Sequence, residues 1–162
     1  MATTTTISRW LHEGEMRAWR GLLEVTLAVN ADLDADLTEA YGLNQGDYGV
    51  LVNLAEAPNR RLRMCDLAGQ LGLSPSGLTR RLDGLVRDGL VMREPAPDDR
   101  RVSYAVLTAR GWATLKAAAP LHVHGVRRHL LDHLSHSQIQ QLGTIFTAVS
   151  KRRLGAQAAL AG

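Results

Sequence analysis

The 162-residue sequence has one cysteine, five prolines and few aromatic residues: three Trp, three Tyr and one Phe. A single cysteine excludes a framework of intramolecular disulfides. The longest apolar runs are far shorter than the roughly 20 residues of a membrane-spanning helix, and no signal peptide is visible. We therefore expect a cytoplasmic protein, not associated with a membrane, of one domain's length.

Motifs of catalysis are also missing from the sequence. It contains no Gly-rich phosphate loop, no nucleophile elbow and no pair of carboxylates spaced for acid–base work. We expect no enzyme, no catalytic residue and no cofactor. The lone Cys65 is interpreted as a small structural residue, and a redox-sensing role is the alternative.

Charge is distributed unevenly along the chain. Residues 1–57 carry three Arg and nine acidic residues, whereas residues 58–110 carry ten Arg and six acidic residues. Arg60, Arg61 and Arg63 come just before a predicted helix, whose free first-turn amides would add to their attraction for phosphate. The net charge of +3 is weak evidence for a nucleic-acid partner, but the basic middle segment favours one. A solvated basic loop is the alternative.

Residues 62–107 have the layout of a winged helix-turn-helix. A first helix is indicated by four apolar residues that share one face at i, i+3, i+4 and i+7 spacing. Gly72 allows the positive φ that follows many helices. Ser74 and Pro75 then form a strong start signal for a second helix, which runs to Gly89. The four residues of the first stripe are Met64, Leu67, Ala68 and Leu71.

The second helix is predicted to enter a DNA major groove. One side carries Leu78, Leu82, Leu85 and Val86. Arg can bind guanine through two hydrogen bonds, and Ser and Thr can reach bases or phosphates. A solvated charged face is the alternative interpretation. At about 100° per residue, the side opposite the leucines is expected to present Ser76, Arg80, Asp83, Gly84 and Arg87, flanked by Gly77, Thr79 and Arg81.

A basic hairpin is predicted after the second helix. Its first strand begins near Leu90, its loop spans residues 95–101, and its second strand alternates through Val102, Tyr104 and Val106. In the loop, the Asp99 carboxylate can orient the Arg101 guanidinium for a narrow minor groove. An incidental surface ion pair is the alternative. Thr108 is the expected cap of a long helix that follows.

The order and spacing of these motifs resemble the MarR family of bacterial transcriptional regulators. The resemblance rests on the Leu-Ala-x-x-Leu-Gly-Leu-Ser run at 67–74, the Ser-x-Leu-Thr-Arg-Arg-Leu run at 76–82 and the Asp-x-Arg wing. It implies a ligand-responsive repressor that binds double-stranded DNA. Carried over by position and joined to Arg61, it gives as expected DNA contacts Arg61, Ser74, Ser76, Gly77, Thr79, Arg80, Arg81, Asp99, Arg100 and Arg101.

The resemblance also implies a homodimer built from the chain termini. We expect a mainly α fold with a small β-hairpin wing, in which a winged helix-turn-helix lobe at about 45–108 is flanked by dimerisation helices at about 1–40 and 109–162. Apolar stripes near both termini need a partner surface. The first is expected on a helix that includes Ile7, Trp10 and Leu11 and ends before the acidic run at 32–36. A two-fold dimer implies a pseudo-palindromic operator whose half-sites lie about 10 base pairs apart.

The signal that such a regulator would sense stays open. The resemblance implies a small aromatic or anionic effector, whose binding residues the sequence leaves unknown. The residues that could line its pocket are Trp10, Arg17, Trp19, Arg20 and Tyr48, and packing of the tryptophans in the dimer core is the alternative.

Five histidines crowd residues 122–136, and His129 and His133 are expected one turn apart on a single helix face. No zinc signature accompanies them, so we predict no metal site and keep metal sensing as an alternative. A winged helix that binds a protein of the transcription machinery is the other alternative function.

Overall fold

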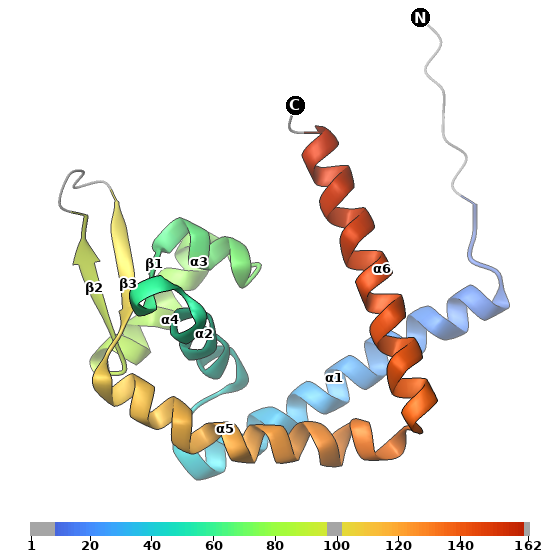
Figure 1. Cartoon of the computed structure of the whole chain (residues 1–162), viewed down its shortest axis with the longest axis horizontal. Coiled ribbons are helices and arrows are strands. Elements are labelled where there is room, and N and C mark those ends of the chain that lie inside the picture. Colours follow the sequence, from blue (N-terminus) through green and yellow to red (C-terminus); the bar gives the residue numbers. More distant parts are fainter. Residues whose placement is uncertain (1–8, 97–101, 161–162) are drawn as a thin grey trace, which may run out of the picture.

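A computed structural model describes the backbone of residues 9–96 and 102–160 and the side chains as far as residue 152. The expected class is confirmed, because helices dominate and a small antiparallel sheet forms the wing (Figure 1). In chain order, the elements are α1 (Glu13–Tyr41), α2 (Gln45–Glu56), η1 (Pro58–Arg60), β1 (Arg61–Arg63), α3 (Met64–Gln70), α4 (Pro75–Arg87), β2 (Val91–Pro95), β3 (Ser103–Leu107), α5 (Ala109–His129), η2 (Leu131–His133) and α6 (His136–Leu160).

The winged lobe contains α2, α3, α4 and the sheet, whose strand order is β1-β3-β2. The predicted hairpin of β2 and β3 is confirmed, with Arg93 opposite Ala105. Strand β1 was not predicted, and it pairs Leu62 with the same Ala105 on the other side. Its three residues are too few for an alternation signal to show in the sequence. The residues just before α3 are therefore held by a strand rather than free in a loop.

The core of the lobe consists mostly of aliphatic side chains from its helices and from β2 and β3, and Leu62 of β1 packs against it partly buried. Burial of these chains is the main favourable contribution to folding, at roughly 25 cal/mol for each Å² removed from water. Leu51, Leu54, Leu67, Leu78 and Leu82 are fully buried. This packing fixes the orientation of α4 on α2 and α3.

The turn between α3 and α4 has the predicted geometry. Gly72 has φ of 64°, in the left-handed region that glycine adopts without strain. The Ser74 side chain caps α4 by accepting a hydrogen bond of 3.1 Å from the Gly77 amide. Pro75 is the first helical residue, as predicted. These signals place the start of α4 at the surface of the lobe.

Helix α1 corrects two expectations. It begins at Glu13, after Trp10 and Leu11, because His12 caps its first turn through a hydrogen bond from the Glu15 amide; Ile7 lies outside the described residues. The helix also continues through the acidic run to Tyr41. Its acidic residues have partners there, and the buried Leu33 and Leu37 anchor the same turns.

Helix α5 connects the wing to α1. It begins beside β3, where Thr108 caps it as predicted, and it continues past Pro120 to His129. Near its end it packs against α1 (Figure 1). Arg128 and His129 both bind Asp36 there, at 3.0 and 3.1 Å.

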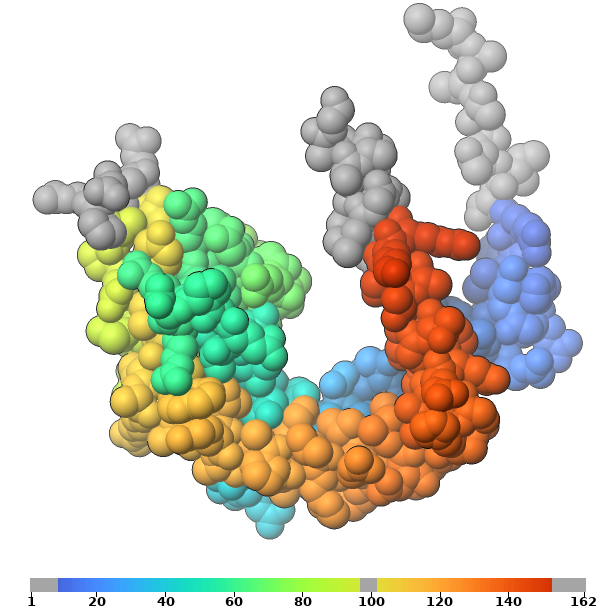
Figure 2. All heavy atoms as spheres, viewed as in Figure 1, coloured from blue at the N-terminus to red at the C-terminus, as the bar shows by residue number. Residues whose placement is uncertain are grey.

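Helix α6 and the N-terminal part of α1 stand apart from the winged lobe, and Figure 2 shows an open concave face between them and the lobe. Many of their apolar side chains are exposed, including Trp19 at 51% and Ile145 at 55%. A hollow of about 1040 Å³ lies between these helices, lined by Leu22, Val25 and Phe146 among others. Within the described residues, no helix has the length and apolar character needed to cross a membrane.

Candidate nucleic-acid interface

Helix α4 has one buried face and one exposed face. Leu78, Leu82 and Leu85 are buried in the core. The side of the helix opposite these leucines therefore points outward, because successive helical residues are about 100° apart. The exposed side carries Ser76, Thr79, Arg80, Asp83 and Arg87. Apart from Gly84, which is half-buried, this agrees with the side expected to face DNA.

The first turn of α4 is organised by short hydrogen bonds. The hydroxyl groups of Ser74 and Ser76 lie 3.2 Å apart, and the Thr79 hydroxyl donates to the Pro75 carbonyl at 2.9 Å. Gly77 is half-buried, and a Cβ there would lie 3.1 Å from Ser74 Oγ. Ser74, Ser76 and Thr79 are thus exposed and locally oriented, whereas Gly77 allows the cap to close.

The two neighbouring arginines of α4 have different surroundings. Arg80 is exposed. Arg81 is only 30% exposed, and its Nη1 donates to Asn44 Oδ1 at 2.9 Å and to Asp47 Oδ1 at 3.3 Å. Burial raises the pKa of the Asp47 carboxyl, although the Arg81 charge acts in the opposite direction. The sequence did not reveal this difference between adjacent arginines.

Another arginine, Arg93, joins the wing to α4. Arg93 of β2 donates to Asp83 Oδ1 at 2.8 Å and to the Thr79 carbonyl at 3.0 Å. Arg93 therefore contacts the exposed side of α4, and the Asp83 carboxylate is engaged within the protein. No sequence pattern predicts this link, because the partners belong to different elements.

Arg61 lies on the outer face of the sheet. Its Cζ lies 4.0 Å from the centroid of the Tyr104 ring, and its Nη1 lies 3.9 Å from Glu94 Oε2. Stacking on an aromatic ring orients the cation without neutralising it. The expected wing contacts Asp99, Arg100 and Arg101 lie outside the described residues.

The histidine cluster does not form the expected pair. Helix α5 ends at His129, and His133 belongs to η2, so the two residues do not share a helix face. His129 instead lies between Asp32 and Asp36, at 3.3 and 3.1 Å. Over the described parts of the chain, no group of three potential ligands is arranged to hold a metal ion.

The residues expected to line an effector pocket lie in separate surroundings. Tyr48 is buried and packs against His122 with ring centroids 4.4 Å apart, Trp19 lines the α1–α6 hollow, and Trp10 is 91% exposed before α1. Burial lowers the pKa of His122.

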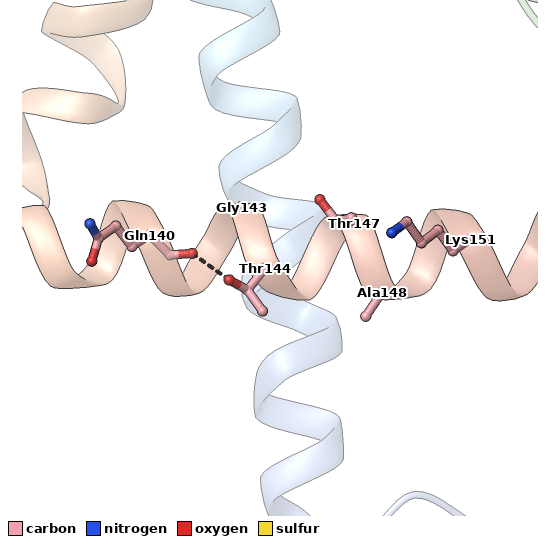
Figure 3. A pocket seen from close by; sticks show the side chains of 6 residues that line it. All are labelled: Gln140, Gly143, Thr144, Thr147, Ala148 and Lys151. Carbon is pink, nitrogen blue, oxygen red and sulfur yellow. Dashed lines mark hydrogen bonds between the residues drawn. The ribbon is translucent and has the colours of Figure 1, made fainter.

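Another hollow lies open on α6 (Figure 3), where the Thr144 hydroxyl donates to the Gln140 carbonyl at 2.9 Å. Its lining comes from one helix alone, so it is not a site built between elements.

Comparison with known proteins identifies the relatives of this chain. A sequence model of the MarR family matches residues 43–103. The HTH-type transcriptional repressor YetL of Bacillus subtilis is 31% identical over 140 residues, which cover 85% of this chain and 83% of YetL. Two solved structures from Streptomyces coelicolor are also similar. AbsC, a MarR family transcriptional regulator, has a TM-score of 0.82 at 38% identity and covers 91% of this chain, with 99% of AbsC matched. Sco3205, a MarR family regulator solved in complex with DNA, has a TM-score of 0.84 at 37% identity, with 90% and 91% of the two chains covered.

Proposed function

The chain belongs to the MarR family of transcriptional regulators, and from this premise we propose that it is a sequence-specific DNA-binding repressor whose α4 is the recognition helix. The observation that carries the proposal is the two-sided character of α4. Its leucines fix it in the core, and its opposite side presents exposed Ser76 and Arg80. A helix held in this way can enter a major groove without losing its packing.

The proposed contacts divide by the chemistry that each can perform. Arg80 is proposed to read guanine edges, because its exposed guanidinium can donate two parallel hydrogen bonds. Ser74, Ser76, Gly77 and Thr79 are proposed to approach bases and phosphates from the first turn. Arg61 and the wing residues Asp99, Arg100 and Arg101 are proposed to hold the flanking backbone and minor groove.

We propose that two copies of the chain form the DNA-binding unit. The exposed apolar side chains of α1 and α6 and the hollow between them support this assembly, because such surface is costly in water. In this arrangement the lobe at about 45–108 reads DNA, and residues of about 1–40 and 109–162 form the dimer. The operator is then pseudo-palindromic, with half-sites about one helical turn, or 10 base pairs, apart.

Three further proposals follow from family membership. A small aromatic or anionic effector shifts the population of dimers toward a form that no longer fits the operator. The protein acts by binding and not by catalysis. It works in the cytoplasm, where its DNA is located.

Selection of bound duplexes from a random DNA pool tests the proposed function. We expect a recovered motif with two-fold symmetry, and affinity that falls steeply as salt rises. Arg80→Ala should cost about 1 to 3 kcal/mol at one base position and flatten its preference, whereas Arg61→Ala should weaken all duplexes about equally. If no duplex is enriched, the chain is not a sequence-specific reader, and binding to a protein of the transcription machinery becomes the better explanation.

A further inference from the structure

Arg81 crosses from the recognition helix to the first turn of α2. Its Nη1 lies 2.9 Å from Asn44 Oδ1 and 3.3 Å from Asp47 Oδ1, and the side chain is 30% exposed. Both acceptors are themselves held, because Asn44 Nδ2 donates to Asp47 Oδ2 at 2.7 Å and the Asp47 amide donates to Asn44 Oδ1 at 2.8 Å. Arg81 therefore meets a preorganised pair of acceptors.

The same turn of α2 is fastened to α1. The Gln45 amide donates to Asp34 Oδ1 at 2.7 Å. Polar contacts thus connect α1 to the first turn of α2, and that turn to the middle of α4. A shift of α4 relative to α2 would have to break the contacts that Arg81 makes.

Gly46 provides the space for this contact. A Cβ at position 46 would overlap the Arg81 guanidinium. No positive φ explains the glycine, because Gly46 is not among the residues with that backbone conformation. Its effect at position 46 is to let the guanidinium lie against the backbone of α2.

From this geometry we propose that Arg81 is a positioning residue, which holds the recognition helix against α2 and does not itself contact DNA. The inference rests on the proposed function and assigns Arg80 and Arg81 opposite tasks: Arg80 reads the groove, and Arg81 sets the position of the helix that carries it. Turning Arg81 toward DNA would leave the Asp47 carboxylate, which is partly buried, without its cation.

The test is the variant Gly46→Ala, which changes no charge and does not replace Arg81. The added methyl group displaces only the flexible end of the Arg81 side chain, so the protein should still fold, with a urea midpoint lowered by the loss of the partly buried Arg81–Asp47 pair. We expect affinity for the selected duplex to fall roughly tenfold, as for residues coupled in one network. Gly69→Ala is the matched control, because a Cβ at that position of α3 meets nothing within 4 Å. It should leave affinity within about twofold, as a distant substitution with no shared partner.

Arg81→Gln supplies the second readout. A positioning role predicts the same loss of affinity, an unchanged salt slope, and no additional loss in the Gly46→Ala/Arg81→Gln double variant. It also predicts weaker discrimination between duplexes whose half-site spacing differs by one base pair, which a loss of stability alone would not produce. Arg80→Gln provides the contrast, since removal of a direct phosphate or base contact alters the salt slope or the base preference.

Two outcomes would overturn the inference. In the first, Gly46→Ala binds the selected duplex as tightly as the wild type or more tightly, as expected if the displaced Arg81 contacts the DNA. Arg81→Gln could instead reduce the salt slope by about one, as expected for a lost phosphate contact. Wild-type protein that enriches no duplex would refute the proposed function instead, so the two failures are distinguishable.

Discussion

The Arg93 guanidinium of β2 lies 2.8 Å from the Asp83 carboxylate of α4. The pair joins the wing to the recognition helix across the exposed side of α4, and the additional bond from Arg93 to the Thr79 carbonyl gives it a fixed direction. The two parts of the lobe that we propose to face DNA are therefore held in one arrangement before DNA arrives. Preorganisation of this kind lowers the cost of binding.

Arg93→Gln is expected to weaken operator binding while changing stability little. Asp83 is 60% exposed, so the pair contributes at most about 1 kcal/mol to folding in water. The loss of a fixed wing should appear as faster dissociation, measured by surface plasmon resonance. Asp83→Asn should resemble Arg93→Gln, and the double variant should be no worse than either. Additive losses would show that Arg93 and Asp83 act separately.

Substitutions at Ser74 should separate the helix cap from DNA contact. Ser74→Ala removes the acceptor for the Gly77 amide and should lower the free energy of unfolding by about 1 kcal/mol, measured by urea denaturation. Ser74→Asp keeps a capping oxygen and should retain stability. Its negative charge should nevertheless weaken DNA binding. Tight binding by Ser74→Asp would place this position away from the DNA.

The half-buried His122 predicts a dependence of stability on pH. Burial holds its pKa below the ordinary value of 6.5, so the unfolded chain binds the proton more tightly than the folded chain does. Its contribution to stability is fully present above pH 6.5 and is lost as the pH falls through the folded-state pKa. The melting temperature should therefore be lower at pH 5.0 than at pH 7.5.

Replacement of His122 should reduce this difference. His122→Phe keeps an aromatic partner for Tyr48 and removes the titrating group. His124→Gln, at an exposed position, is the control and should retain the wild-type difference. Asp36 does not interfere, because its hydrogen bond to His129 lowers its pKa below 3.8. An equal difference in His122→Phe and wild type would assign the pH response to other groups.

Gly111 in the first turn of α5 is predicted to be intolerant of a side chain. A Cβ there would overlap the Leu90 carbonyl and lie 2.8 Å from Leu107 Cδ1. Gly111→Ala should lower the free energy of unfolding by about 1 to 3 kcal/mol, as for other overpacked positions. Gly49→Ala in α2 is the matched control. Its Cβ would lie at an ordinary 3.8 Å from Leu71 Cδ2, so the variant should unfold no more easily than wild type.

Local signals made the recognition helix predictable. Ser74, Pro75 and the leucine spacing define where α4 begins and which face is buried. The acidic run at 32–36 was misleading, because a cluster of like charges suggests a helix end when its partners are unknown. In the fold, Asp34 binds an amide of α2 and Asp36 binds Arg128. These contacts join residues far apart in the chain.

Contacts between distant parts of the chain also decide the arrangement of the candidate site. The exposed side of α4 follows from helical periodicity alone. The different positions of Arg80 and Arg81 do not, because adjacent arginines carry the same local signal. Only the packing of α2 against α4 brings Asn44 and Asp47 to Arg81. Strand β1 was missed for a similar reason, since its pairing with β3 defines it more clearly than its three residues do.

Because α5 is one continuous helix, a small tilt at one of its ends displaces the other end. At 1.5 Å per residue, the 21-residue helix is about 31 Å long. Its far end is clamped to Asp36 of α1, and its near end emerges from β3. A tilt of about 5° would displace one end by about 3 Å, close to the 3.4 Å rise of one base pair. Small changes in the angle of α5 would thus move the lobe that we propose to read DNA out of step with its target.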